Sequence, residues 1–162
     1  MPKGSTNRLL RLGKQACIAG GRDMAIEFTD QMQEFISSAL DDRLFCALGT
    51  ASSDGIPNIS LKGSMAIYDS ETLSYWERVK GSALDNVVEN PNAVIFYRNP
   101  GERINWRFHG KVTVHDSGEV WDKVKSITPQ GELDRDPDLK GVAVLIRIDT
   151  ITDLGSHVLQ SR

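Results

Sequence analysis

A short basic stretch that contains Arg78, Lys80, Gly81 and Ser82 has the composition of a phosphate-binding turn. It follows a strand-like run at residues 72–76 and precedes a helical pattern. Backbone N–H groups at the start of a helix lack intrahelical partners and carry partial positive charge, so Gly81 and Ser82 are expected to present such donors to an anion. Arg78 and Lys80 add full positive charge. An ordinary helix cap explains the same residues equally well.

Two strand-like segments carry further polar side chains that could join this turn around one ligand. Ser60 and Lys62 lie two residues apart on one segment, and Asn105 and Arg107 lie two apart on another. Residues at this spacing share one face of a strand. If the turn and the two pairs lie close together in the fold, they form a single binding site. The alternative is that the side chains of each group simply face the solvent.

Lys62 stands out among these cations because its own strand carries no other charge. It shares a face with small polar residues, including Ser60, whereas Ile59 and Leu61 alternate onto the opposite face. Alternation of this kind is typical of a half-buried strand. We therefore expect Lys62 on a polar face, and Ile59 and Leu61 in the hydrophobic core.

The hydrophobic patterns predict a mainly β protein with helices at its margins. Strands show alternation of period two, helices show apolar residues at helical spacing, and clusters of Gly, Pro, Asn and Ser mark the turns. Strands are expected at residues 44–48, 58–64, 65–68, 72–76, 93–98, 103–114 and 142–148, and helices at residues 32–40, 81–88 and 117–125. Mostly short connections favour an antiparallel sheet closed into a small barrel.

The chain of 162 residues, 40% of them hydrophobic, fits one compact domain at residues 24–162. Residues 1–23 form a basic N-terminal extension, because their five Lys and Arg residues meet no acidic partner before Asp23. A loop at residues 128–140 is rich in Pro, Gly and charge. It could cover a ligand or simply cross the surface.

Composition excludes several classes of protein. A net charge of −3 argues against nucleic acid or an anionic membrane as a partner. No apolar run approaches the roughly 20 residues that span a bilayer, and no signal-peptide core is present, so a cytoplasmic location is expected. The three histidines and two cysteines lack metal-ligand spacing, so no metal site is predicted. Cys46, in an apolar run, is expected to be a buried and inert thiol.

The order of these elements resembles the pyridoxamine 5′-phosphate oxidase-like family of FMN-binding split barrels. The segments that carry the resemblance are Asp54-Gly-Ile-Pro-Asn-Ile-Ser60, Arg78-Val-Lys-Gly-Ser82, Asn90-Pro91 and Asn105-Trp-Arg-Phe-His-Gly110. The likeness extends from about Phe28 to Ile151. It implies a six-stranded antiparallel split β-barrel that forms a homodimer, with FMN bound at the subunit interface.

The resemblance also implies which residues contact the cofactor. Ser60, Leu61 and Lys62 match the strand beside the flavin, and Glu77 and Arg78 match the end of the next strand. Lys80, Gly81 and Ser82 match the phosphate turn, and Asn105 matches a position close to the isoalloxazine ring. Arg107, on the same strand face as Asn105, completes the predicted cofactor-binding residues. The strand with Ser60, Leu61 and Lys62 is expected to contact the flavin ring through its backbone groups. Lys62 or Arg107 would offset negative charge that develops on the reduced flavin.

Two departures from the oxidases of the family argue against oxidation of vitamin B6. Ser60 stands where those oxidases have an arginine, and the chain ends at Leu159-Gln-Ser-Arg162 instead of an Arg-x-Ala-Pro-like ending that contacts the substrate. A general flavin redox role is compatible with both departures. The expected activity is therefore an FMN-dependent oxidoreductase that acts on a small molecule or a nicotinamide reductant.

Alternatives to this activity stay open at the level of the sequence. The same barrel could bind a deazaflavin, or it could bind haem through an axial His109, His115 or His157. His109 could also donate a proton or simply make a surface contact. A third reading is a dimer that binds flavin, or senses it, without turnover, because residues that hold a flavin need not select a substrate.

Overall fold

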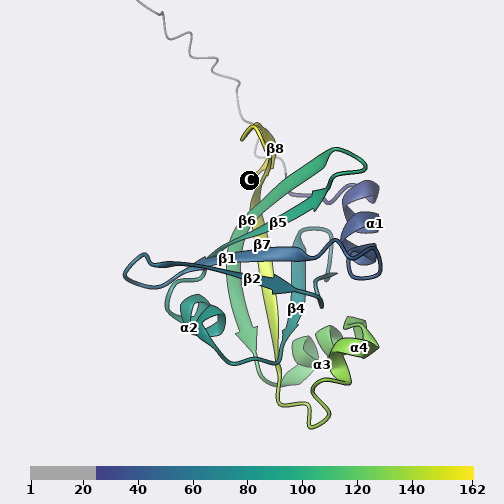
Figure 1. Ribbon diagram of the computed structural model, residues 1–162. Coiled ribbons are helices and arrows are strands. Elements are labelled where there is room, and N and C mark those ends of the chain that lie inside the picture. Colours follow the sequence, from purple (N-terminus) through teal and green to yellow (C-terminus); the bar gives the residue numbers. More distant parts are fainter. Residues whose placement is uncertain (1–24) are drawn as a thin grey trace, which may run out of the picture.

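The computed structural model describes residues 25–162, and the predicted basic extension at residues 1–23 lies outside these described residues. Figure 1 shows a strongly curled sheet with helices at its margins. In chain order the elements are α1 (Asp30–Ser38), β1 (Cys46–Ala51), β2 (Pro57–Lys62), β3 (Ala66–Ile67), β4 (Thr72–Glu77), α2 (Ser82–Glu89), β5 (Asn92–Asn99), β6 (Ile104–His115), α3 (Gly118–Ile127), α4 (Gln130–Leu133), β7 (Val142–Asp153) and β8 (Val158–Ser161). The mainly β prediction is confirmed.

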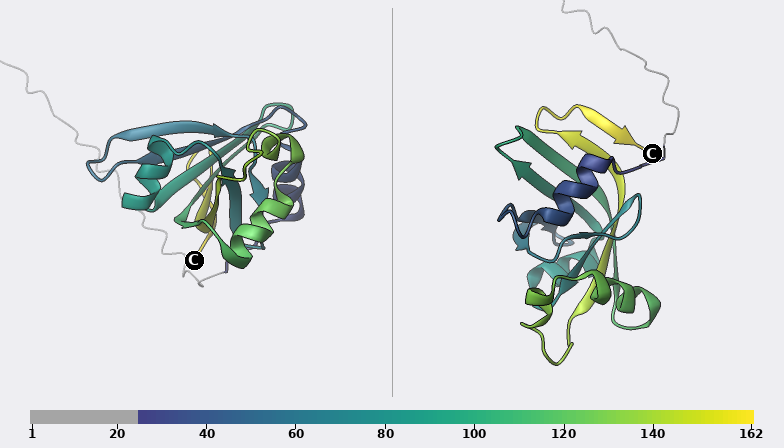
Figure 2. Two further views of the ribbon diagram at one scale, coloured as in Figure 1. Left: turned by 90° about the horizontal axis from the view of Figure 1, so that it is seen from below. Right: turned by 90° about the vertical axis from the view of Figure 1, so that its right-hand side faces the viewer.

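All strand pairs are antiparallel, in the order β2-β1-β5-β6-β7-β4-β3, with β8 added to β7. The two longest strands, β6 and β7, have 12 residues each and pair at the centre of the sheet. The first half of β7 pairs with β4, and its second half pairs with β8. In Figure 2 the helices α3 and α4 lie at the opposite end of the molecule from β8.

β2, at one end of this strand order, meets β4, next to the other end, through side chains instead of a strand ladder. The Ser64 hydroxyl, just after β2, donates to the Trp76 carbonyl and accepts from the Trp76 N–H, both at 3.1 Å. The side chains of Lys62 on β2 and Glu77 on β4 form an ion pair. We call this line of side-chain contacts between β2 and β4 the seam. It is the split of a split barrel, as the sequence predicts.

The sheet of the described residues has eight strands, so the expected count of six is too low. The two shortest strands are β3, with two residues, and β8, with four mostly exposed residues. The strand predicted at residues 65–68 contains β3, whereas β8 was not predicted, because four mostly exposed residues show no clear alternation. The turn into β8 is held by the Asp153 carboxylate, which accepts from the His157 N–H at 2.9 Å.

The core lies inside the curl and is rich in aromatic side chains. Trp106 and Phe108 on β6 are buried, whereas His109 and Lys111 are exposed, which confirms the alternation predicted for this strand. Phe108 packs edge-on against Phe28, with ring centroids 5.8 Å apart. Cys46 is fully buried as predicted, and burial raises the pKa of its thiol to about 12.

A second, smaller core joins α3 and the segment 128–140 to β4. Trp76 packs against Trp121 of α3 at a centroid distance of 5.1 Å. The Asp136 carboxylate accepts from the Trp76 indole N–H at 2.9 Å and from the Gly141 N–H at 2.8 Å. Burial alone would raise the pKa of Asp136, but these hydrogen bonds lower it below the ordinary value. The segment 128–140 is therefore fixed next to the seam.

The prediction that Ile59 and Leu61 lie in the core is wrong. Their side chains are 76% and 67% exposed, and Ser60 and Lys62 point to the inner side of the curl. The reason is the register, because Lys62 lies opposite the buried Cys46 on β1. Alternation identified two faces correctly, but at the edge of this sheet the polar face is the inner one.

Within residues 25–162, no helix is both long and apolar enough to cross a membrane. Nor do three His, Cys, Asp or Glu side chains of these residues gather into a group that could hold a metal ion.

Candidate functional site

A cavity of about 300 Å³ opens along the seam, between the end of β2, the end of β4 and the first turn of α2. Of the predicted site residues, those that line it are Ser60, Leu61, Lys62, Glu77, Arg78, Gly81 and Ser82. Sequence analysis missed the other lining residues, which are Asn58, Gly63, Ser64, Trp76, Val79, Ala83 and Glu132. The phosphate-type turn and the polar strand therefore converge on one space, as predicted.

Ser60 offers this cavity a hydroxyl group with an unused hydrogen-bonding capacity. Its oxygen is buried and has no hydrogen-bond partner among the described residues. A buried polar group without a partner costs free energy that a bound ligand can recover. The unpartnered Ser60 hydroxyl thus favours a polar ligand in this cavity.

Ser60→Ala is expected to act in opposite directions on the free protein and on ligand binding. Removal of an unpartnered hydroxyl should leave the free energy of unfolding unchanged or raise it by up to about 1 kcal/mol. Loss of a hydrogen bond to FMN should weaken its binding by about fivefold. Urea denaturation and FMN titration measure the two effects.

Ser74→Ala is the matched control, because its hydroxyl is also buried and unpartnered but does not line the cavity. It should leave FMN binding unchanged. A Ser60→Ala protein that is less stable and binds FMN normally would contradict a role in ligand binding.

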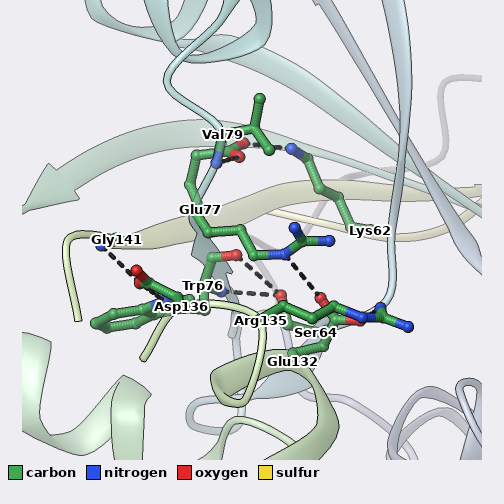
Figure 3. Close-up of polar contacts among 10 residues, drawn as sticks. Lys62, Ser64, Trp76, Glu77, Val79, Glu132, Arg135, Asp136 and Gly141 are labelled. Atoms are coloured by element: carbon green, nitrogen blue, oxygen red, sulfur yellow. Dashed lines mark hydrogen bonds and ion pairs between the residues drawn. The ribbon is translucent and has the colours of Figure 1, made fainter. Parts of the chain in front are cut away.

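Lys62 and Glu77 form a buried ion pair across the seam (Figure 3). Glu77 also accepts a hydrogen bond from the Val79 N–H at 3.1 Å, and the Lys62 ammonium lies 4.8 Å from the centre of the Tyr75 ring. The ammonium charge is therefore balanced by a carboxylate of the same chain. Lys62 is not the free cation that its isolated position on β2 suggested.

The first turn of α2 supplies backbone donors, although not all of the expected ones. The Gly81 N–H is used inside the turn, where it donates to the Val79 carbonyl at 2.9 Å. Ser82 and Ala83 are the first two helical residues, so α2 offers their N–H groups no carbonyl. The Lys80 side chain is exposed and does not line the cavity. The free N–H donors at this turn are thus those of Ser82 and Ala83, with Gly81 as the N-cap.

Arg78 and Glu132 face each other at the rim of the cavity. The Arg78 Nε lies 3.4 Å from Glu132 Oε2, and Arg135 Nη1 donates to Glu132 Oε1 at 2.7 Å. Glu132 lies on α4, inside the segment whose role the sequence left open. No pattern in that polar segment distinguishes Glu132 from its neighbours, so only the three-dimensional structure identifies it.

Asn105 and Arg107 of the chain do not line this cavity. They lie on the outer face of the sheet, where Arg107 is paired with Phe96 of β5. The Arg107 guanidinium donates to the carbonyls of Asp153 and Leu154, at 2.9 and 3.3 Å. The expectation that all three polar groups converge is therefore wrong for a single chain, because β6 directs these two side chains away from the inner side.

The outer face around Arg107 is a continuous apolar surface. The strand register places Ile59 beside Gly49 and Val94, and Leu61 beside Ala47 and Phe96. Two shallow hollows of about 430 and 260 Å³ lie on this face, and Ile59 and Val94 line both of them. We call these six residues of β1, β2 and β5 the outer apolar face.

The three histidines proposed as alternative haem ligands lie apart. His109 is exposed and lines the larger of these hollows. His115 Nε2 lies 3.0 Å from the Thr113 hydroxyl, and His157 Nδ1 lies 2.8 Å from Asp153 Oδ2. The hydrogen bond from His157 lowers the pKa of the Asp153 carboxyl.

The described residues thus form an antiparallel split barrel with a cavity at its seam that is lined in part by the basic turn. Residues 28–151 match the family model described as pyridoxamine 5′-phosphate oxidase. The chain belongs to this family. Comparison with curated proteins gives no match.

Solved structures share the fold at low sequence identity. HupZ from Group A Streptococcus is 21% identical, with a TM-score of 0.65 and coverage of 81% of this chain and 97% of HupZ. An FMN-binding protein from Syntrophomonas wolfei is 15% identical, with a TM-score of 0.56 and coverage of 76% and 86%. A protein named F420 reductase is 19% identical, with a TM-score of 0.52 and coverage of 72% and 94%. These similarities establish the split-barrel fold.

Proposed function

We propose that the protein binds FMN and acts as an oxidoreductase on a small molecule, with a nicotinamide as a candidate reductant. The observation that carries the proposal is the set of donors around one cavity: the first turn of α2, Arg78 and the unpartnered Ser60 hydroxyl. Family membership and the FMN-binding protein of the same fold support it. These donors suit a phosphate monoester, which accepts several charge-assisted hydrogen bonds.

We further propose that the active form is a homodimer with the flavin at the subunit interface. The outer apolar face is too exposed to be explained by the core of one chain, and a second copy is the partner that would cover it. In this arrangement Asn105 and Arg107 of one subunit would contribute side chains to the binding cavity of the other subunit. The proposal thereby explains why the predicted site residues lie on two faces of one sheet.

Bound FMN supplies hydride or single-electron transfer. The chain's own residues then bind and orient it. Ser82, Ala83 and Arg78 would hold the phosphate, and backbone groups at the unpaired edge of β2 would contact the ring. The paired Lys62 and Glu77 form a buried floor that excludes water from the inner side.

Arg78→Ala is expected to weaken FMN binding by about ten- to a hundredfold, the cost of one charge-assisted phosphate contact. Lys80→Ala should weaken it by less than about threefold, because this exposed side chain lies outside the cavity. The two variants remove the same charge from positions two residues apart. Titration of the ligand-free proteins, followed by flavin absorbance, measures both; equal losses would contradict the assignment of the phosphate site.

The same titration separates the alternative cofactors. If the protein binds the deazaflavin F420 but not FMN, its cofactor would be the one in the name of the structural neighbour F420 reductase. Haem binding would give a Soret band, which His109→Ala should alter if that residue is the axial ligand. A flavin that NADH and NADPH fail to reduce anaerobically would indicate a binding or sensing dimer without turnover.

A further inference from the structure

Glu132 places a buried carboxylate in a cavity that is otherwise suited to an anion. The residue is 8% exposed, and it packs so closely on Gly63 that a Cβ there would lie 3.0 Å from Glu132 Oε1. An incoming phosphate would meet this negative charge on the same rim as Arg78. Like charges at such short range repel strongly where water is excluded.

The two ion pairs of the cavity differ in how easily they open. Lys62 and Glu77 are both nearly buried, and Glu77 has a second donor in the Val79 N–H. The Arg78 side chain is 34% exposed and reaches Glu132 through one long contact of 3.4 Å. A partly exposed pair with this geometry is weak. Arg78 is therefore the cation that can leave its partner.

Arg135 keeps Glu132 compensated when Arg78 moves. Its Nη1 lies 2.7 Å from Glu132 Oε1, whereas Arg78 contacts the other oxygen, Oε2. The two arginines thus use separate oxygens of one carboxylate. Departure of Arg78 leaves Glu132 with a short charged hydrogen bond, so the buried charge is not stranded.

We infer that Glu132 is a positioning residue that holds Arg78 in the ligand-free protein and competes with the ligand phosphate for it. This inference rests on the proposed phosphate site. Every anion must draw Arg78 away from Glu132, so each loses the same increment of affinity. Inorganic phosphate, which has no other contacts to offset this loss, binds too weakly to fill the cavity, whereas a cofactor with a ring binds.

Glu132→Gln is expected to tighten FMN binding by about fivefold, because it removes a competing charge worth about 1 kcal/mol. The inhibition constant of inorganic phosphate, measured by its competition with FMN, should also fall by about fivefold, because both anions lose the same competitor. Glu34→Gln is the control, since it makes the same charge change on the exposed surface of α1. Thermal unfolding of each variant checks that the fold is intact.

A double-mutant cycle with Arg78→Ala tests whether Glu132 acts through Arg78. In the Arg78→Ala background, Glu132→Gln should tighten FMN binding clearly less than it does in the wild-type background, because only the direct repulsion of the phosphate is left to relieve. Equal tightening in both backgrounds would show that Glu132 only repels the phosphate directly, and this would overturn the inference. Weaker or unchanged FMN binding in the single Glu132→Gln variant would overturn it as well.

Arg135→Gln provides an independent variant if Glu132→Gln fails to fold, because the Arg135 side chain is 62% exposed. With its second partner removed, Glu132 should hold Arg78 more firmly and FMN binding should weaken by about threefold. Unchanged binding would contradict the inference. Absence of FMN binding in every protein, wild type included, would instead contradict the proposed function together with the inference that rests on it.

Discussion

Ile59→Arg is expected to convert the proposed dimer into a monomer and to abolish FMN binding at micromolar concentrations. Ile59 is 76% exposed and lines both hollows of the outer apolar face. In a twofold dimer the change acts twice, and each lost isoleucine contact costs about 2 kcal/mol before the burial of an unpaired arginine is counted. The dimer should therefore weaken by at least about a thousandfold.

Sedimentation equilibrium over a range of protein concentrations measures the first effect, and FMN titration measures the second. Val88→Arg is the control, because Val88 is also exposed, at 68%, but lies on α2 outside the outer apolar face. It should leave both properties unchanged. A wild-type protein that is monomeric at high micromolar concentration, or an Ile59→Arg variant that still dimerises, would contradict the proposed interface.

Gly110→Ala is expected to lower the free energy of unfolding by roughly 3 kcal/mol or more, a large part of the stability of a typical domain. Gly110 lies at the register shift between the central strands β6 and β7. A Cβ at this position would lie 2.2 Å from the Arg147 carbonyl oxygen, which is backbone and cannot rotate away. β6 and β7 would have to move apart next to Gly110, at the centre of the sheet.

Urea denaturation of the ligand-free protein measures this effect independently of any cofactor. Gly131→Ala makes the same chemical change on α4, where a Cβ would meet no atom within 4 Å. Its stability should stay the same or rise by up to about 1 kcal/mol, because alanine favours a helix. Similar unfolding midpoints for the two variants would show that the strands can adjust around the added methyl group.

The sequence was sufficient to predict the strands and helices that follow local rules. Alternation along β6 identified its buried and exposed residues, and Pro91 marked the end of α2 just after Glu89. Three residues of the basic turn, Arg78, Gly81 and Ser82, line the cavity, whereas Lys80 does not. These features depend on neighbours in the chain, so a local pattern is enough to find them.

Features that depend on distant segments were missed. The pattern of β2 could not show which of its faces is internal, since that depends on pairing with β1. Glu132 reaches the cavity only because Asp136 ties its segment to Trp76, 60 residues earlier in the chain. The separation of Asn105 and Arg107 from Lys62 likewise follows from the path of the curled sheet.

The seam between β2 and β4 is held by side-chain contacts and not by backbone hydrogen bonds between paired strands. A closed barrel pairs every strand edge, so its backbone offers a ligand few free groups. Here Ser64 and the pair of Lys62 and Glu77 close the gap with side chains. Side chains change by single substitutions, whereas a strand ladder does not. The seam is therefore the part of the fold whose contacts single substitutions can change without rebuilding the sheet.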